Sequence, residues 1–319
     1  MKRFLSLSMA VAAVVGMAAC SDQTATGVAT DRIEAPLLDV SPGVLAVTNI
    51  PYATRSATQK LDIHLPTTGA KPYPVVMWIH GGGWSTGDKQ LAPTNAVLTL
   101  LTKGIAVVSI NYRLSGEARW PAQIHDVKAA LRWVRANATK YSLDANRIGA
   151  WGLSAGGHLS AMLGTTDGIA SLTDLSLGNP TMSEKVKAVT DWFGPVAFMS
   201  MDSQLTLNGC PLFGGTGHSS SQSPESKLLG APIPTVPSLV QSANPRAYVT
   251  AGDAKFLVMH GTKDCTVPYQ QSQAMAARLN AVMPGSATLQ LLPGEAHGGP
   301  TWTSAPTVSV VTTFFKNTL

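Results

Sequence analysis

Short, continuous apolar runs recur along this chain with helical patterns between them, and this alternation constrains the fold more than any other feature. The runs are clearest at 74–79, 105–110, 147–152, 186–192, 256–260 and 288–292. A run that is apolar at nearly every position suits a strand buried on both faces, as in parallel sheets covered by helices. We therefore predict an α/β fold: a mostly parallel, twisted sheet of about eight strands with helices on both faces.

The remaining sequence suggests how the chain is divided. Residues 20–42 are polar and lack periodicity, so we predict a flexible tether there, followed by one folded domain over 43–319. Within that domain, residues 194–254 are rich in Ser, Pro, Gly and Thr and form a loop-rich excursion, with short helices expected at 223–229 and after Asn244. Loops of this length are usually functional or mobile. The excursion either lies near a functional site, where it could act as a lid, or is a surface insertion.

Residues 1–19 have the pattern of an export signal. Lys2 and Arg3 supply a positive start, and the apolar stretch that follows is too short for a good membrane span. It ends in the sequence AAC, which resembles a bacterial lipoprotein cleavage site with Cys20 as the lipidated residue. The alternative is a plain secretory signal cut near the same place. Both predict an exported protein, either a lipoprotein of the cell envelope or a secreted protein, with membrane contact only through the lipid.

The cysteine count agrees with export. The chain has three cysteines, so lipidation of Cys20 would leave Cys210 and Cys265 as a pair. Disulfides persist in an oxidising compartment, and we predict a bond between these two residues. Two free, buried thiols are the alternative. Because Cys265 directly follows Asp264, a bond would brace the loop that carries this aspartate.

The segment 152–157 reads GLSAGG and fits the pattern G-x-S-x-G between a predicted strand and a predicted helix. In this context the serine lies on a tight strand-to-helix turn, and small residues two positions to either side prevent clashes. The turn lifts the hydroxyl above the strand ends, and the start of the helix faces the negative charge that develops in the reaction. We predict Ser154 as a nucleophile; an unreactive serine in a glycine-rich turn is the alternative.

The sequence HGGGW at residues 80–84 follows directly on a predicted strand. Glycines let the backbone approach a substrate oxygen closely. A loop of this type complements the N–H of the residue after the nucleophile in an oxyanion hole. We predict the amides of Gly82, Gly83 and Ala155 as the donors, with a plain loop as the alternative. Trp84 is expected to bind substrate in the acyl pocket or to pack beneath it, and the histidine of this segment to make structural hydrogen bonds.

Chain order predicts the partners of Ser154, because in this arrangement the nucleophile is followed by an acid and then by a histidine. Asp264 lies just past the predicted strand 256–260, and His297 lies just past 288–292. All three groups fall on loops at the carboxyl ends of strands, where open α/β sheets place their sites. We predict His297 as the general base and acid, and Asp264 as the carboxylate that orients the imidazole and stabilises the imidazolium.

Other acids and histidines fit these roles less well. Asp253 precedes its strand and so lies at the wrong end of the sheet. Asp191 ends a strand one earlier than the usual acid position and stays an alternative. His218 lies in the excursion and could touch substrate. The remaining candidates are expected to pack in the fold or lie at its surface: His125, His158 and His260.

Charge and missing motifs narrow the function further. The net charge is +5, of which Lys2 and Arg3 supply two, and no block of Lys or Arg is present. This pattern argues against a nucleic-acid partner. The sequence has no HExxH, no cluster of Cys and His, no GxGxxG opening a helix and no GxxxxGK[ST]. We therefore expect neither a metal nor a cofactor.

Taken together, these stretches resemble the α/β-hydrolase superfamily from about residue 43 to the C-terminus, and in particular bacterial carboxylesterases of the feruloyl and acetyl-xylan esterase kind. The matching stretches are HGGGW at 80–84, SINYRL at 109–114, GLSAGGH at 152–158, DWFGP at 191–195 and HGTKD at 260–264. Hormone-sensitive-lipase-like esterases share the HGGG loop, but they usually carry Asp at the position of Leu153 and a helical cap ahead of the loop. That subgroup fits this chain less well.

The resemblance implies hydrolysis of small acyl or aryl esters through an acyl-enzyme on Ser154, without a cofactor. The substrate would be a small-molecule or carbohydrate-linked ester. Two alternatives stay open. A serine peptidase or amidase could use the same three groups on the same fold. A non-catalytic surface-binding protein could also have this fold, although such proteins usually lack one of the three groups.

Overall fold

The computed structural model describes residues 38–41, 44–92 and 94–319. The predicted signal at 1–19, the lipidation site Cys20 and most of the predicted tether lie outside the described residues. Residues 38–41, at the end of the predicted tether, pair with the sheet as a strand, which corrects that part of the prediction. No helix within the described ranges is long and apolar enough to cross a membrane.

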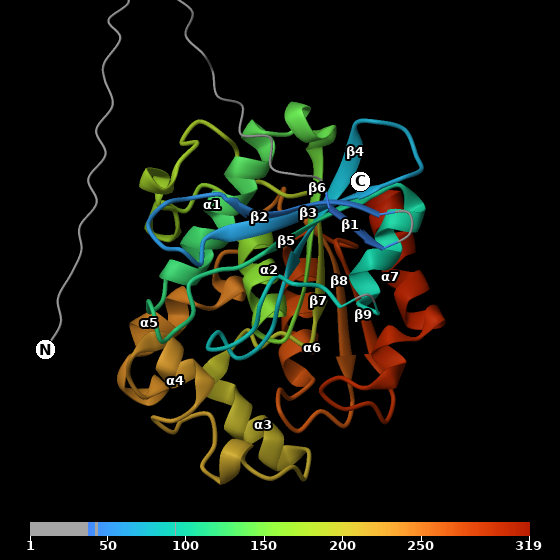
Figure 1. Ribbon diagram of the computed structural model, residues 1–319. Coiled ribbons are helices and arrows are strands. Elements are labelled where there is room, and N and C mark those ends of the chain that lie inside the picture. The colour runs from blue at the N-terminus through green and yellow to red at the C-terminus, as the bar shows by residue number, and fades with distance from the viewer. Residues whose placement is uncertain (1–37, 42–43, 93) are drawn as a thin grey trace, which may run out of the picture. The chain divides into compact units, whose positions relative to one another are not determined.

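Nine strands of the described residues form one sheet, in the order β1-β2-β3-β5-β4-β6-β7-β8-β9 (Figure 1). In chain order they are β1 (Leu38–Ser41), β2 (Val44–Pro51), β3 (Lys60–Pro66), β4 (Tyr73–Ile79), β5 (Ala106–Ile110), β6 (Leu143–Leu153), β7 (Ala188–Trp192), β8 (Lys255–Gly261) and β9 (Ala287–Leu292). β5 to β9 and β4 pair in parallel, whereas β1, β2 and β3 are antiparallel to their neighbours. The predicted mostly parallel α/β fold is confirmed.

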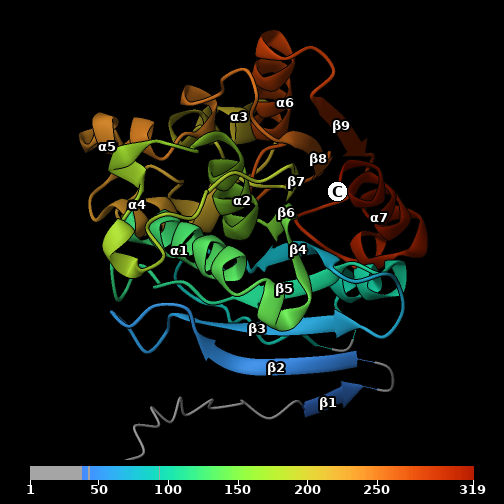
Figure 2. The same ribbon diagram turned by 90° about the horizontal axis from the view of Figure 1, so that it is seen from above.

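Helices cover both faces of this sheet. α1 (Ala122–Ala136), α2 (Ala155–Thr165) and α6 (Gln270–Val282) pack on one face, and α7 (Ala305–Thr318) packs on the other beside the 3₁₀ helix η1 (Ala96–Lys103). Figure 2 shows α1 and α2 on one side of the twisted sheet and α7 on the opposite side. The helices explain why the central strands are apolar along their whole length.

Strand β4 shows this double burial residue by residue. Val75, Met77 and Ile79 belong to the apolar cluster beneath α1 and α2, and all three are fully buried. Val76 and Trp78 point to the other face and belong to the cluster beneath α7. Because successive side chains of a strand alternate between faces, a run that is apolar at every position is what two covered faces require.

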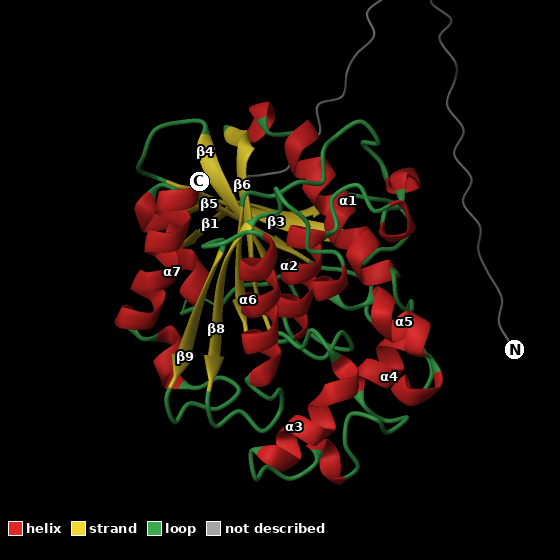
Figure 3. Ribbon diagram, turned by 180° about the vertical axis from the view of Figure 1, so that it is seen from behind, coloured by secondary structure: helices red, strands yellow, loops and turns green. Residues whose placement is uncertain are grey.

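The excursion at 194–254 connects β7 to β8 with little regular structure. It contains three short helices: α3 (Met201–Leu207), α4 (Pro224–Leu229) and α5 (Pro237–Ser242). The helix expected at 223–229 is present as α4, whereas a single 3₁₀ turn, Pro245–Ala247, follows Asn244. In Figure 3 the arrows of β8 and β9 point toward the side of the molecule on which α3 lies. The excursion therefore stands at the carboxyl edge of the sheet.

Candidate active site

Ser154 lies between β6 and α2 in a conformation that few residues other than glycine adopt, with φ 54° and ψ −123°. The turn is closed by glycines at the positions where the sequence predicted small residues. A Cβ at Gly152 would lie 2.1 Å from the carbonyl oxygen of Gly156, and a Cβ at Gly156 would lie 2.0 Å from that of Ile79. The backbone packing on both sides thus holds Ser154 in a strained conformation, which is common at functional sites.

A chain of hydrogen bonds joins the three residues that sequence reasoning singled out. His297, on the loop after β9, has its Nε2 2.9 Å from the Ser154 Oγ. Its Nδ1 is 2.7 Å from Oδ2 of Asp264, on the loop after β8. Because a carboxylate only accepts, Nδ1 carries the proton and Nε2 is left to accept the serine proton. The arrangement can therefore remove a proton from the Ser154 hydroxyl.

Both carboxylate oxygens of Asp264 accept hydrogen bonds. The amides of Thr266 and Val267 donate to its Oδ1 at 2.8 and 2.9 Å. His260 Nε2 donates to Oδ2 at 3.1 Å, so two histidines share this oxygen. Burial alone would raise the pKa of Asp264, but the hydrogen bonds and charges of His260 and His297 hold it well below its ordinary value. The carboxylate is therefore ionised and cannot rotate freely.

Sequence reasoning did not foresee the contact of His260 with Asp264. His260 is fully buried at the end of β8, where its Nδ1 accepts from the Ser272 hydroxyl at 2.7 Å and its Nε2 also donates to the Val267 carbonyl at 2.8 Å. The separation of four residues between His260 and Asp264, across a turn, was the only signal in the sequence. Its role remains structural, but it acts on the loop that presents the acid.

The glycine loop after β4 follows the left-handed backbone that its composition favours. The φ angles are 103° at Gly82, 56° at Gly83 and 54° at Trp84. The Gly82 carbonyl accepts from the amides of Ser85 and Thr86, which fixes the turn. Within the part of the chain that the structure describes, no backbone carbonyl accepts from the amides of Gly82, Gly83 or Ala155. These N–H groups are thus available to a ligand.

A cavity of about 250 Å³ brings the oxyanion candidates and the nucleophile together. Its lining residues are Gly82, Gly83, Trp84, Ser85, Ser154, Ala155, Pro195, Phe213, His218, Pro224, Glu225, Thr266 and Val267. We call it the catalytic pocket. Trp84 is almost fully buried and packs against Phe198, with ring centroids 5.6 Å apart, and against His158 at 5.2 Å. The part of Trp84 that lines the pocket is therefore rigidly placed.

The excursion contributes a second buried histidine–carboxylate pair to this pocket. His218 Nδ1 is 2.9 Å from Oε2 of Glu225, and Nε2 is 3.0 Å from the Thr266 carbonyl. Burial alone would lower the pKa of His218, but the hydrogen bond and charge of Glu225, with smaller effects of Thr266 and Asp202, raise it above its ordinary value. His218 was expected only as a residue that could touch substrate, and its pairing with Glu225 gave no signal in the sequence.

The other candidates lie elsewhere. Asp191 is fully buried and accepts from the Gly194 amide at 2.9 Å, and burial raises its pKa to about 7. Among the described residues no histidine hydrogen-bonds to it. His158 donates to or accepts from no catalytic candidate; its Nε2 donates to the Ala243 carbonyl at 2.7 Å, and burial lowers its pKa to about 4. His80 contacts the Gly81 carbonyl and stacks on Tyr112.

The predicted pair Cys210 and Cys265 is bonded, with Cα atoms 5.4 Å apart and a sequence separation of 55. The bridge ties the excursion to the residue directly after Asp264. Within the described ranges, no three His, Cys, Asp or Glu side chains are grouped so that they could hold a metal ion.

Several known proteins are similar to this chain in sequence. The BD-FAE family model matches residues 61–279. The esterase LipC of Mycobacterium tuberculosis is 32% identical over 245 residues, which cover 75% of this chain and 57% of LipC. The probable carboxylic ester hydrolase LipM of the same organism is 29% identical, over 78% of this chain and 55% of LipM. The chain thus spans a little over half the length of these curated relatives.

A solved structure extends the likeness to the fold. A truncated form of a carbohydrate esterase from gut microbiota superposes on this chain with a TM-score of 0.76 at 35% sequence identity. The match covers 86% of this chain and 95% of that chain. The domain described above therefore corresponds to nearly the whole of that truncated chain.

Proposed function

This chain belongs to the BD-FAE family of α/β-hydrolases, as its sequence motifs indicated, and we propose that it is a serine carboxylic ester hydrolase that works through an acyl-enzyme. The observation that carries the proposal is the hydrogen-bonded chain from Asp264 through His297 to Ser154, which lies beside the backbone amides of Gly82, Gly83 and Ala155. The similarity to named esterases supports the same reaction class.

In the first half of the reaction, the Ser154 Oγ attacks the ester carbonyl carbon while His297 Nε2 takes its proton. The carbonyl oxygen becomes an oxyanion, and the amides of Gly82, Gly83 and Ala155 donate to it. The ionised Asp264 stabilises the imidazolium. The tetrahedral intermediate then breaks its C–O bond to the alcohol, His297 donates the proton to that leaving oxygen, and the acyl group stays on Ser154.

In the second half, a water molecule takes the place of the alcohol. His297 removes a proton from the water as its oxygen attacks the acyl carbon, and the same amides stabilise the second oxyanion. Collapse of this intermediate breaks the bond to Ser154 Oγ, which receives the proton from His297. The products are a carboxylic acid and free enzyme, so no co-reactant beyond water is required.

The substrate class we propose is a small acyl group on a carbohydrate-linked ester. The catalytic pocket of about 250 Å³ is lined by the apolar side chains of Trp84, Phe213 and Pro224, and its volume suits a short acyl chain. The 35% identity to a carbohydrate esterase supports a saccharide as the alcohol. Export from the cytoplasm, as the N-terminal sequence predicts, agrees with the Cys210–Cys265 bridge.

A fluorophosphonate probe tests the proposed nucleophile directly. We expect it to add one phosphonyl group to the native protein, located by peptide mapping at Ser154, and to leave Ser154→Ala unlabelled. Ser160→Ala is the matched control, because this buried serine lies on α2, the helix that begins directly after Ser154, and it should be labelled like the native chain. Absence of labelling in the native protein would overturn the mechanism and favour a non-catalytic binding protein.

Turnover on matched esters and amides tests the reaction class. We expect kcat/KM on p-nitrophenyl acetate to exceed that on aminoacyl p-nitroanilides by several orders of magnitude, and to fall as the acyl chain is lengthened. A higher rate on the anilides would make the protein an amidase or peptidase instead.

A further inference from the structure

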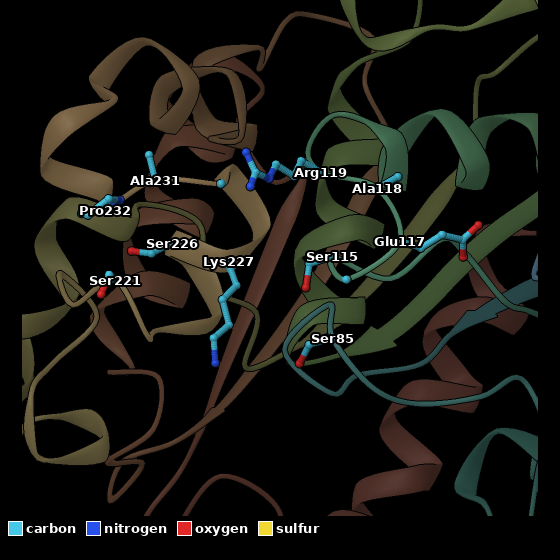
Figure 4. Close-up of a pocket in the computed structure, with 12 residues that line it drawn as sticks. Ser85, Ser115, Glu117, Ala118, Arg119, Ser221, Ser226, Lys227, Ala231 and Pro232 are labelled. Carbon is cyan, nitrogen blue, oxygen red and sulfur yellow. The ribbon is translucent and has the colours of Figure 1, made fainter.

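A second, larger hollow of about 610 Å³ shares Ser85 with the catalytic pocket. Figure 4 shows the residues that line it. Its lining residues are Ser85, Ser115, Gly116, Glu117, Ala118, Arg119, Ser221, Ser226, Lys227, Gly230, Ala231 and Pro232. We call it the cationic hollow. Ser85 lines both spaces, and α4 separates them: Pro224 and Glu225 face the catalytic pocket, whereas Lys227 lines the hollow. A substrate whose acyl group is held at Ser154 can therefore extend into the hollow past Ser85.

The charged residues of the lining are Glu117, Arg119 and Lys227, so its net charge is positive. Arg119 and Lys227 are exposed, and neither side chain makes an ion pair or a hydrogen bond with another described residue. The one lining acid, Glu117, accepts a hydrogen bond from the Thr58 hydroxyl at 2.9 Å. In Figure 4 its carboxylate lies across the hollow from Lys227. Two cations thus remain available to a ligand.

The loop that carries Arg119 packs against the segment that carries Lys227. The Arg119 side chain lies against Gly230, where a Cβ would meet its Cδ and Nε. The amide of Trp120 donates to the Leu228 carbonyl at 2.9 Å, which joins the Arg119 loop to α4. The segments that carry the two cations are therefore held together before any ligand arrives.

The remaining lining groups suit a sugar better than an acyl chain. Four serines contribute hydroxyls, and no aromatic or long aliphatic side chain lines the hollow. The volume is within the usual range for small-molecule sites. Hydroxyl groups match the hydroxyls of a saccharide, and an arginine beside a lysine matches a carboxylate, because charge-assisted hydrogen bonds are the strong ones.

We propose that the cationic hollow binds a uronic acid unit in the saccharide part of the ester, with Arg119 and Lys227 contacting its carboxylate. This inference rests on the proposed function and names its substrate more closely: an acylated acidic oligosaccharide. The small acyl group occupies the catalytic pocket, and the charged sugar lies on the other side of Ser85 and α4.

Two acetylated oligosaccharides test the proposal if they are identical except that one carries glucuronic acid where the other carries glucose. We expect the native protein to prefer the acidic ester in kcat/KM by about a hundredfold, mostly through KM. Arg119→Gln and Lys227→Gln should each reduce that preference about tenfold, and the double variant should abolish it. Arg119→Lys with Lys227→Arg should keep most of it. The preference should also shrink in 1 M salt.

Lys255→Gln is the matched control, because Lys255 is exposed at the start of β8, at the opposite edge of the sheet; it should keep the full preference. Equal kcat/KM on the two oligosaccharides in the native protein would overturn this inference, and so would a loss of activity on both in the double variant. p-Nitrophenyl acetate, which is too small to reach the hollow, separates the two proposals. If the native protein hydrolyses it but shows no preference between the sugars, only the inference fails; if the native protein hydrolyses none of the three, the proposed function fails.

Discussion

Two histidine–carboxylate pairs lie at the active site: His297 with Asp264, whose histidine contacts Ser154, and His218 with Glu225, which line the catalytic pocket. The Nδ1 of His297 is 2.7 Å from Asp264, and the Nδ1 of His218 is 2.9 Å from Glu225. The pairs differ in exposure: the side chain of His297 is 20% exposed and that of His218 is 2% exposed. The ring of His297 is therefore the more accessible of the two.

The two pairs differ more clearly in the group that faces Nε2 of the histidine. Nε2 of His297 faces the hydroxyl of Ser154, which can give up a proton, whereas Nε2 of His218 faces the carbonyl of Thr266, which can only accept. Both nitrogens of His218 therefore face acceptors, so its protonated form fits this site and joins the excursion to the acid loop. A histidine–carboxylate pair can therefore act as a general base or as a structural link. The group that faces the second ring nitrogen, a hydroxyl or a carbonyl, decides which.

Replacing each histidine by glutamine tests this difference, and we expect it to have the largest effect on kcat. We expect His297→Gln to lower kcat on p-nitrophenyl acetate by about a millionfold, because the proton acceptor is lost. His218→Gln should lower it less than about tenfold while reducing the melting temperature. Equal losses of kcat in the two variants, both folded by circular dichroism, would show that His218 also takes part in proton transfer.

The carboxylates give the next comparison. Asp264→Asn should lower kcat about ten-thousandfold, because an amide no longer selects the tautomer in which Nε2 accepts. Glu225→Gln should change kcat less than about tenfold. Steady-state kinetics on the same ester measure both. A mild effect of Asp264→Asn would indicate that another acid, such as Asp191, can orient His297.

Removing the bridge between the two regions should affect stability more than chemistry. We expect Cys210→Ser with Cys265→Ser to lower the free energy of unfolding by about 2 to 4 kcal/mol, since the bond restricts the unfolded chain. The reduced native protein should match the double variant in urea unfolding. A loss of kcat beyond about tenfold in a still-folded variant would mean that the bridge also positions Asp264.

The charge of His218 should have the smallest effect, which is a pH dependence of the free energy of unfolding. Its pKa is raised in the folded state, so the stability from the pair is fully present below its ordinary pKa and is lost as the pH rises through the folded value. Glu225→Gln should therefore destabilise the protein by about 1 to 3 kcal/mol in mild acid and by less in alkali. Urea midpoints across pH measure the difference, and a constant difference would mean that His218 is uncharged.

The sequence predicted the parallel core and the three residues Ser154, Asp264 and His297 because the signals are local. Asp264 and His297 each follow a continuous apolar run, and parallel strands bring such loops to one edge. The pairing of His218 with Glu225 depends on how an irregular segment folds back on itself, which no periodicity encodes. Strand β1 was missed for a related reason: its pairing with β2 depends on a neighbour, and its own composition resembles a tether.

The disulfide between Cys210 and Cys265 also turns part of the polypeptide into a closed covalent ring that includes α4, α5 and β8. A protease that nicks one bond within this ring leaves the fragments joined, so they stay together on a gel run without a thiol. Cleavage of the excursion after Cys210 becomes visible as two bands only after reduction, whereas a cut before Cys210, for example in α3, separates the fragments without it. Limited proteolysis of this protein is therefore informative only when each digest is examined both with and without dithiothreitol.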